Sequence, residues 1–424
     1  MTSSNTPLIT TASQTITPKF KTTLGCNGAI KTPYTSIDSD LEINAIRLIQ
    51  DKTDIFIITV DTLFVTNDMI DEVITTLSPN YHLKKENFMM IASHTHYAPC
   101  LDKTKPNLGT VDPEYYIVFI KKLVSIVQTL LDQIPQPVDI YYSDIETKDI
   151  MISRRKKTWI LRKKIIFQKI MTNYPNNLNT IDSKLRLIKY CDPESKKPLA
   201  IAWNIACHPV MYPSPNHLTG HFPADIRTYL RKKVTAIPIL FLQGFAGDIK
   251  PKNHPKAITL KNKIKTIINK QAPFQDFTKR SYSNWLQSIT NTLDKLLLPK
   301  SKKINNPSLK IKTYQCPLKE IWETPSTNQT LTVLAIYLNK NTIILGVSAE
   351  IVSAYSLTLQ SLFPNMTLIP VGYMGSVFGY WPTHSMLKEG GYEANGFLTG
   401  FSITGSFKNS LETCFKTMIK QVIP

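Results

Sequence analysis

The sequence predicts an α/β protein in which layered mixed β-sheets are flanked by helices. Two short apolar runs, at 54–60 and 87–92, have the length and composition of buried strands. Between them, apolar residues recur at helical spacing up to Leu77, behind a polar start at Thr66. Two later apolar runs flank a hairpin signal at 339–341, which indicates that the sheets are mixed. Such alternation of strand and helix signals is typical of this class.

Turn and cap signals extend this pattern along the chain. Asp112 followed by Pro113 predicts the start of a helix that runs to about Gln133. Helices are also expected after Pro223, Tyr282, Glu350 and Phe407, and strands at Val138–Tyr142, Leu199–Ala206, Pro238–Gln243, Thr330–Leu338, Thr342–Val347 and Thr367–Val371. Residues 250–310 are interpreted as helical insertions or surface. Residues 1–18, rich in Ser and Thr, are expected to be a loose N-terminal segment, and 19–424 to form one catalytic domain.

Composition places the chain among globular proteins. Apolar residues make up 42% and charged residues 19% of its 424 positions, with no long biased tract. The longest apolar stretch, 115–131, contains Lys121 and Lys122, which favours a buried helix over a membrane span. The N-terminus lacks a basic start followed by an apolar run, so a cytoplasmic location is expected. The six scattered cysteines, without CxxC spacing, are interpreted as reduced thiols: Cys26, Cys100, Cys191, Cys207, Cys316 and Cys414.

The net charge of +19 has three interpretations. The first is a lysine-rich solvated surface. The second is peripheral contact with an anionic membrane, because a basic cluster surrounds Trp159 and Ile160: Arg154, Arg155, Lys156, Lys157, Arg162, Lys163 and Lys164. The third is nucleic-acid binding, and no specific nucleic acid is expected because no nucleic-acid module is recognisable.

A His-Thr-His segment directly after the run at 87–92 is the first candidate for chemistry. In extended chain, residues two apart point to the same side, so His94 and His96 can face one cavity. Strand ends are where α/β proteins place their sites, and imidazole suits zinc. The alternative is a pair of polar histidines in a loop.

Three later segments repeat this arrangement of a polar side chain at a strand end. His208 ends the apolar run at 201–207; alone it resembles a core or turn histidine, but with the first segment it favours a shared metal. His217 and His221 are further candidate ligands. Asp248 lies in a Gly-rich turn, where it either caps the turn or belongs to an active-site loop. Glu350 follows the strand at 342–347 and is either an anionic ligand or a helix cap.

Taken in order, these segments resemble the neutral (non-lysosomal) ceramidase family, from about residue 20 to about residue 400. The family's motifs correspond to Ser93–Pro99, Cys207-His208-Pro209, Gly247–Pro251 and Ser348–Glu350. A tyrosine followed twelve residues later by a Tyr-Glu pair corresponds to Tyr380 and Tyr392-Glu393. The resemblance implies a ceramidase-like catalytic domain without the C-terminal immunoglobulin-like domain of the longer enzymes.

The resemblance also implies a set of site residues. Zn²⁺ would be bound by His94, His208, Glu350 and Tyr380. The catalytic residues would be His96, which moves the proton of the attacking water, Arg154 with Tyr392, which bind the polar head or the oxyanion, and Asp248 in its loop. The implied reaction is zinc-dependent hydrolysis of an N-acyl amide, as in ceramide cleaved to sphingosine and fatty acid. Two positions depart from the family pattern: Lys250 replaces a serine, and His221 replaces an acid.

Other functions fit parts of the same pattern. A metal-dependent amidohydrolase also uses His-x-His at a strand end, within a (β/α)8 barrel. An amide-forming enzyme would use the same groups in the reverse direction. A catalytically degenerate relative would bind lipid or a partner through its basic surface. The acyl chain, the amine product, the direction of the reaction and the oligomeric state are not fixed by the sequence.

Overall fold

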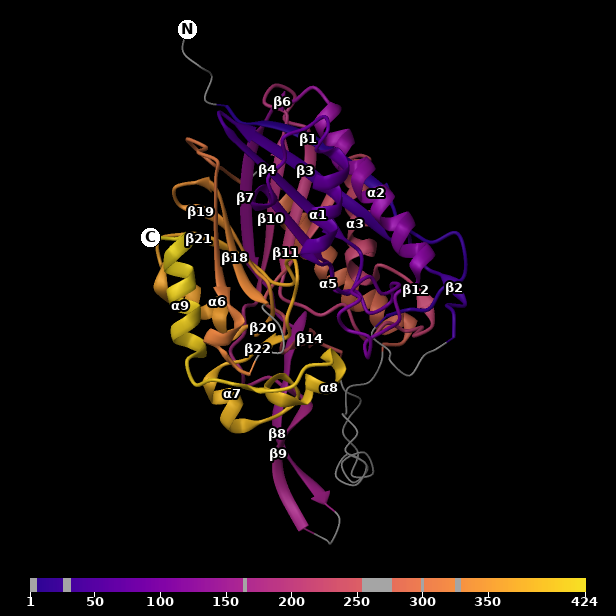
Figure 1. Cartoon of the computed structure of the whole chain (residues 1–424), viewed down its shortest axis with the longest axis vertical. Helices are drawn as coiled ribbons and strands as arrows, with labels where there is room; N and C mark the ends of the chain where they lie inside the picture. Colours follow the sequence, from indigo (N-terminus) through magenta and orange to yellow (C-terminus); the bar gives the residue numbers. More distant parts are fainter. Residues whose placement is uncertain (1–5, 26–31, 163–165, 254–276, 299–300, 325–328) are drawn as a thin grey trace.

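Three mixed β-sheets form the framework of the computed structural model, which describes residues 6–25, 32–162, 166–253, 277–298, 301–324 and 329–424 (Figure 1). The first sheet has the order β5-β4-β3-β1-β6. Its strands are β1 (Leu8–Thr15), β3 (Glu42–Gln50), β4 (Thr53–Val60), β5 (Phe88–Ala92) and β6 (Gln136–Pro137). All neighbours are antiparallel except β4 and β5, which run parallel at one edge.

The second and third sheets share this plan of an antiparallel body with one parallel strand at the edge. The second has the order β13-β11-β10-β7-β15, built from β7 (Asp139–Glu146), β10 (Lys184–Cys191), β11 (Pro198–Ile205), β13 (Ile239–Gln243) and β15 (Lys302–Lys303). The third has the order β16-β18-β19-β21, built from β16 (Lys310–Pro317), β18 (Thr330–Asn339), β19 (Thr342–Val347) and β21 (Thr367–Val371). The parallel edge strands are β13, beside β11, and β21, beside β19.

One face of each large sheet packs into a common core. That core joins Ile46 and Ile57 of the first sheet, Ala202 and Leu240 of the second and Ile336 of the third. Helices cover the outer faces (Figure 1): α1 (Asn67–Leu77) and α2 (Pro113–Asp132) on the first sheet, α3 (His221–Lys233) and α5 (Lys279–Leu297) on the second, and α6 (Ala354–Leu362) and α9 (Leu411–Val422) on the third. The predicted α/β class with layered mixed sheets is therefore confirmed.

Smaller elements complete the structure. A three-stranded sheet contains β14 (Ile249–Pro251), β8 (Met151–Arg162) and β9 (Ile166–Asn176). Paired short strands are β2 (Ser36–Ile37) with β12 (His217–Leu218), β17 (Trp322–Glu323) with β23 (Ser406–Phe407), and β20 (Glu350–Ile351) with β22 (Tyr380–Trp381). The short helices are η1 (Lys85–Asn87), η2 (Leu318–Glu320), α7 (His384–Glu389), the π-helix η3 (Tyr392–Gly396) and α8 (Leu398–Phe401). No helix in the described ranges is both long and apolar enough to cross a bilayer.

Local signals account for the elements that the sequence predicted. The Asp112 carboxylate accepts hydrogen bonds from the amides of Glu114 and Tyr115, and Pro113 occupies the first helical position of α2. Thr66 is the N-cap of α1, as its polar start indicates. The hairpin at 339–341 joins the antiparallel strands β18 and β19. These elements form where the chain pattern alone favours them.

Two expectations are corrected by the structure, and one element is present that the sequence did not predict. The segment 1–18 is not loose throughout, because Leu8–Thr15 forms β1, which pairs along its whole length with β3. The basic region around Trp159 forms the β8–β9 hairpin, although its charge gave no strand signal. The described sheets are separate and mixed, which excludes the eight parallel strands of a (β/α)8 barrel. Cys26, the lysines at 163 and 164, and much of 250–310 lie outside the described residues.

The common core predicts a large difference between two isoleucine substitutions. Ile46 is fully buried between the sheets, so Ile46→Ala is expected to lower the free energy of unfolding by about 2–5 kcal/mol through lost burial and a cavity. Ile117 on α2 is 54% exposed, and Ile117→Ala is the matched control with a change under about 0.5 kcal/mol. Chemical denaturation followed by circular dichroism measures both. Equal shifts of the two midpoints would contradict this view of the core.

Candidate metal centre

Each large sheet brings one candidate ligand to a single point. His94 follows β5 of the first sheet, His208 follows β11 of the second, and Glu350 follows β19 of the third. Backbone hydrogen bonds join these edges, from the amide of Ala92 to the carbonyl of Tyr373 (3.1 Å) and from that of Gly372 to the carbonyl of Gln243 (2.9 Å). The centre therefore lies where the three parallel edges meet.

The two histidines are oriented by backbone carbonyls. Nδ1 of His94 lies 2.9 Å from the carbonyl oxygen of Leu63, and Nδ1 of His208 lies 3.0 Å from that of Ile249. These contacts fix Nδ1 as the protonated nitrogen and leave Nε2 with a lone pair. His94 also has a left-handed backbone (φ 64°), an uncommon conformation for a non-glycine residue that sets the direction of its side chain.

Both Nε2 atoms point at the same carboxylate oxygen. Oε2 of Glu350 lies 3.4 Å from Nε2 of His94 and 3.3 Å from Nε2 of His208. A tetrahedral zinc ion with bonds of about 2.0–2.1 Å separates neighbouring ligand atoms by about 3.3–3.4 Å. Nε2 of His208 is buried and makes no hydrogen bond to any of the described residues. The separation and the orphaned nitrogen both fit a metal held between these three side chains.

His96 belongs to the same group. The ligand nitrogens of His94, His96 and His208 all lie within 4.8 Å of one another. The His96 ring centroid is 5.0 Å from that of His94 and 6.1 Å from that of His208, and its side chain is half-buried whereas the other two are buried. The structure thus brings together two overlapping donor sets, which share His94 and His208 and add either Glu350 or His96.

Protonation states also suit a divalent cation. Burial lowers the pKa of His208 to about 4. Burial, with His94 and His208, lowers the pKa of His96 well below its usual value, and Lys250 acts in the same direction. Burial works to raise the pKa of Glu350, but His94 and His208 outweigh it and hold that pKa well below its usual value. Neutral imidazoles beside an ionised carboxylate are the forms that bind a metal.

Tyr380 lies beside Glu350 because β22 pairs in parallel with β20 and sets the two residues opposite each other. Its hydroxyl oxygen accepts a hydrogen bond from Nη2 of Arg154 at 3.1 Å. Burial raises the pKa of Tyr380 well above its usual value, and the charge of Glu350 adds to this, whereas Arg154 opposes it. Tyr380 therefore lies at the edge of the centre, and its hydroxyl contacts the buried guanidinium group of Arg154.

Arg154 is held by three partners. Its Nη2 also donates to the carbonyl oxygen of Gly247 (2.7 Å), and its Nε donates to Oε1 of Glu393 (2.7 Å). Arg155 binds the other oxygen of Glu393 through Nη1 (2.5 Å). Sequence reasoning noted Glu393 beside Tyr392 without giving it a role. The two adjacent arginines in the sequence are the one signal that could have indicated a buried acidic partner such as Glu393.

Tyr392 and Asp248 occupy the periphery of the centre. The Tyr392 ring lies 5.5 Å from the Arg154 guanidinium carbon and is 43% exposed, so it marks the solvent side of the site. The Asp248 carboxylate is buried and accepts a hydrogen bond from the backbone amide of Ser353 at 2.8 Å. The Asp248 carbonyl accepts the amide of Arg154 at 2.9 Å. These contacts assign Asp248 a positioning role, which ties its loop to Arg154.

Tyr373 was missed by the sequence reasoning. Its ring lies 4.2 Å from the His94 ring, and its hydroxyl donates to Oε2 of Glu350 at 3.5 Å. No motif surrounds it, and its position after β21 is the one available signal. In contrast, the candidates His217 and His221 lie apart from the group: His217 pairs with exposed Asp38, and His221 is stacked on Tyr97.

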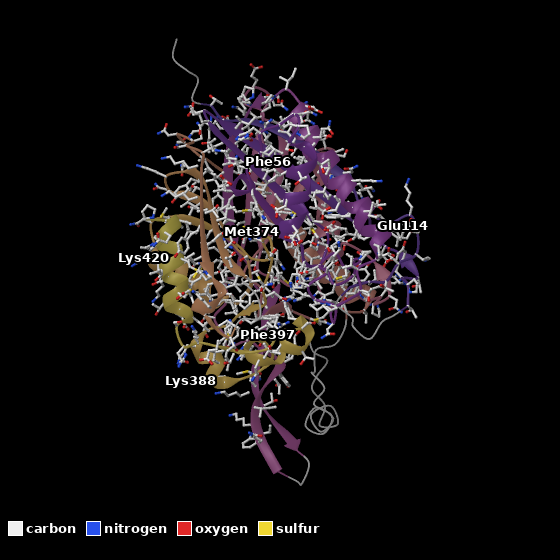
Figure 2. The ribbon with its side chains drawn as sticks, viewed as in Figure 1. Phe56, Glu114, Met374, Lys388, Phe397 and Lys420 are labelled. Atoms are coloured by element: carbon white, nitrogen blue, oxygen red, sulfur yellow. The ribbon has the colours of Figure 1, made fainter. Side chains whose placement is uncertain are left out.

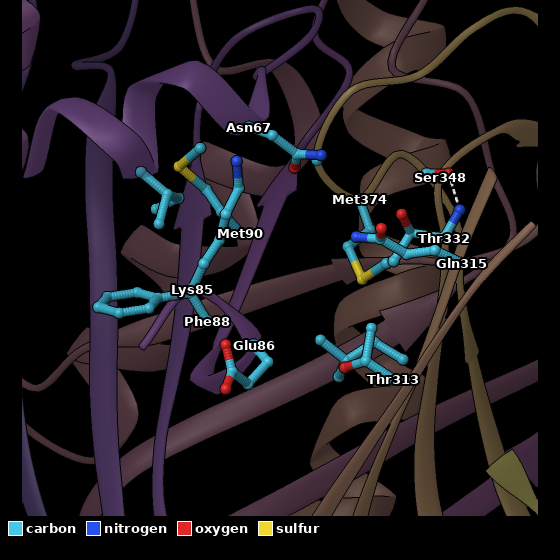
Figure 3. Close-up of a pocket in the computed structure, with 13 residues that line it drawn as sticks. Asn67, Lys85, Glu86, Phe88, Met90, Thr313, Gln315, Thr332, Ser348 and Met374 are labelled. Carbon is cyan, nitrogen blue, oxygen red and sulfur yellow. Dashed lines mark hydrogen bonds between the residues drawn. The ribbon is translucent and has the colours of Figure 1, made fainter. Parts of the chain in front are cut away.

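A cavity of about 210 Å³ lies apart from the residues of the candidate centre (Figure 3). Its lining includes the apolar side chains of Met90 and Met374 and the polar side chains of Ser348 and Gln315. Its lining contains none of the three histidines of the metal group, although Met374 adjoins Tyr373 in the chain. Figure 2 labels Met374, which is buried, and Phe397, which lies lower in the view. The ring centroids of Phe397 and Tyr380 are 5.1 Å apart.

Comparison with solved structures identifies the architecture. The neutral ceramidase from Pseudomonas aeruginosa matches with a TM-score of 0.70, at 11% sequence identity, over 99% of this chain and 74% of that one. This chain has the neutral ceramidase fold. A ceramidase complexed with C2 matches with a TM-score of 0.72, at 11% identity, over 99% of this chain and 75% of the other. No family model and no curated protein matches the sequence. The ceramidase resemblance of the motifs is thereby confirmed for the fold.

The buried Asp248 predicts a pH dependence of stability. Burial raises its pKa to about 6, above its unfolded value. Because this pKa is higher in the folded than in the unfolded state, the protonated carboxyl stabilises the folded protein by on the order of 2–3 kcal/mol. That contribution is fully present below about pH 4 and is lost as the pH rises through about 6. Asp248→Asn keeps an acceptor for the Ser353 amide and does not titrate, so its stability falls less over this range. Denaturant midpoints between about pH 4 and pH 7 test this.

Asp294→Asn is the control, because Asp294 is partly exposed on α5, where it pairs with Lys233 and accepts a hydrogen bond from the Tyr229 hydroxyl that an amide oxygen can also accept. It should reproduce the wild-type profile. Parallel profiles for wild type and Asp248→Asn would show that the Asp248 carboxyl does not carry the dependence.

Proposed function

We propose that this chain is a zinc-dependent amidase that hydrolyses the N-acyl amide bond of ceramide or a ceramide-like lipid. The observation that carries the proposal is the pair of buried imidazoles whose Nε2 atoms lie 3.4 and 3.3 Å from one Glu350 oxygen. The ceramidase fold supports the choice of substrate class, because the solved structures that share it are ceramidases.

His94, His208 and Glu350 would hold the ion, with Tyr380 as the fourth ligand that the family resemblance implies. When bound, zinc lowers the pKa of water from about 16 towards about 7 and polarises a carbonyl. The chain supplies the rest of the site: Tyr373 and two backbone carbonyls keep the ligand side chains in place. A carboxylate and imidazoles are donors that zinc accepts in catalytic centres.

Two residues would act on the amide itself. His96, half-buried beside the ligand histidines, accepts the proton of the attacking water and passes it to the leaving amine. Arg154 uses Nε and Nη2 for its partners in the described part of the chain, which leaves Nη1 for the oxyanion of the tetrahedral intermediate. Tyr392, over Arg154, would contact the polar head of the substrate.

Metal content tests the centre directly. The purified protein is expected to hold one zinc per chain, and His208→Ala to lose it, because the variant removes one of two imidazoles that share Glu350. His217→Ala is the matched control: His217 pairs with Asp38 at the surface and its loss should leave the zinc in place. Elemental analysis of freshly purified protein measures the ion. Metal-free wild type would favour a binding-only relative and defeat the proposal.

Turnover tests the two catalytic assignments. His96→Ala should retain some zinc but lower kcat about 10²–10⁴-fold by removing the proton carrier. Arg154→Lys should keep the zinc and lower kcat about 10²–10³-fold, because an ammonium group cannot satisfy Glu393 and the oxyanion together. The assay is release of fatty acid from a short-chain ceramide in detergent micelles, with His217→Ala as control. Full activity in either variant would remove that residue from the mechanism.

A further inference from the structure

The β8–β9 hairpin extends away from the body of the protein (Figure 1). Among the described strands, β8 pairs with a strand other than β9 at its start, where Met151–Ser153 pairs with β14. From Arg155 to Arg162, β8 pairs with β9 alone, in an antiparallel register that ends with Arg162 opposite Ile166. A two-stranded ribbon without further support is marginally stable unless something else covers it. The outer hairpin therefore has the geometry of a contact element.

Charge on this hairpin has one sign. Residues 150–181 contain eight basic side chains and no acidic one, in a chain with 31 acidic residues. At the base, Arg154 and Arg155 both pair with Glu393, and Arg155 also pairs with Glu389 at 3.3 Å; both arginines are buried, so they do not belong to the surface. Farther out, Lys169 is exposed, and Lys157 is half exposed with a distant partner in Glu389 (3.8 Å). The outer hairpin presents positive charge to solvent.

An exposed tryptophan accompanies these lysines. Trp159 is 55% exposed, whereas the other four tryptophans are buried: Trp203, Trp285, Trp322 and Trp381. The register sets Trp159 opposite Lys169, with Lys157 and Met171 as the next pair on the same face of the ribbon. Tryptophan prefers the interface between water and lipid, and lysines beside it bind anionic headgroups.

The hairpin is joined to the candidate centre at its base. Arg155, at the base of the hairpin, shares Glu393 with Arg154, and Arg154 binds Tyr380. Phe397, labelled in Figure 2, packs on Tyr380, which in turn accepts a hydrogen bond from Arg154 at the base of the hairpin. Any surface that the described part of the hairpin binds would thus be linked to the candidate centre through Arg155, Glu393 and Arg154.

We propose that the outer β8–β9 hairpin, defined by Lys157, Trp159 and Lys169, docks the protein on a membrane that contains anionic lipid. Trp159 inserts at the level of the headgroups, and the lysines bind lipid phosphates and carboxylates. The binding itself is independent of catalysis; its consequence, access to a lipid substrate within the bilayer, rests on the proposed function. An interleaved aromatic residue favours lipid over a purely electrostatic partner such as duplex DNA.

Tryptophan fluorescence gives a site-specific measurement. Since Trp159 is the exposed one of five, a blue shift on adding vesicles reports its transfer into lipid. We expect the shift with vesicles of phosphatidylcholine and phosphatidylserine, and a weaker one at high salt, because exposed charges are screened. Trp159→Phe should lose the shift while still sedimenting with the vesicles. A shift that persists in Trp159→Phe would overturn the assignment.

Sedimentation with the same vesicles measures affinity. Trp159→Ala and Lys169→Glu are each expected to weaken binding about tenfold, and the double variant about a hundredfold. The controls are Ile134→Ala, which removes a 92% exposed apolar residue beyond α2, and Lys420→Glu on α9, far from the hairpin in Figure 2. Both should bind like wild type. Equal losses in the controls, or none in the hairpin variants, would refute the docking element.

Two further arms separate this proposal from the proposed function. His208→Ala should bind vesicles as wild type does, even if it holds no metal. The hairpin variants should hydrolyse micellar short-chain ceramide normally, provided the chain is an amidase, and lose turnover of ceramide in anionic vesicles. Loss of single-stranded RNA binding with unchanged vesicle binding in Lys169→Glu would instead assign the hairpin to nucleic acid and overturn the membrane proposal.

Discussion

One carboxylate shared by two imidazoles is the constraint on which the candidate site depends. Glu350, His94 and His208 are each at most 2% exposed, and burying such groups costs free energy unless they bind one another or a cation. Each ligand comes from a different sheet, at the end of β5, β11 or β19. The common core that packs the three sheets together therefore also sets the ligand separations, and a shift of one sheet would move one ligand out of reach.

Elements with a strong local pattern were predictable from the sequence. β4, β5 and α2 carry apolar runs or caps that suffice on their own, as the Asp112 cap shows. β1 and the β8–β9 hairpin lack such runs. Thr-rich β1 forms because β3 offers it a complete antiparallel partner, and β8 pairs despite its charges because β9 lies next to it in the chain. Their stability comes from pairing, which a window of sequence does not contain.

The same distinction applies within the site. His94, His208 and Glu350 were nominated because each follows an apolar strand, and the structure brings these three together. Tyr380 was nominated by family resemblance, and pairing of β20 with β22 explains its place. Tyr373 could not be nominated, because its contact with Glu350 depends on β21 lying beside β19 in the fold. Strand order is a long-range property, so side chains that owe their place to it are hidden in the sequence.

Burial divides the basic cluster of the sequence into two parts with different physical roles. A register shift between Ser153 and Arg155 marks an irregularity in β8, and adjacent residues of a regular strand would point to opposite faces. With this irregularity both arginines reach one carboxylate, Glu393, at 2.7 and 2.5 Å. Both guanidinium groups are therefore paired inside the protein, and this pairing holds Arg154 beside Tyr380. The solvent-exposed side chains of β8 begin beyond Arg155. The strand that positions Arg154 at the centre is therefore also the strand that carries exposed Lys157 and Trp159 outward.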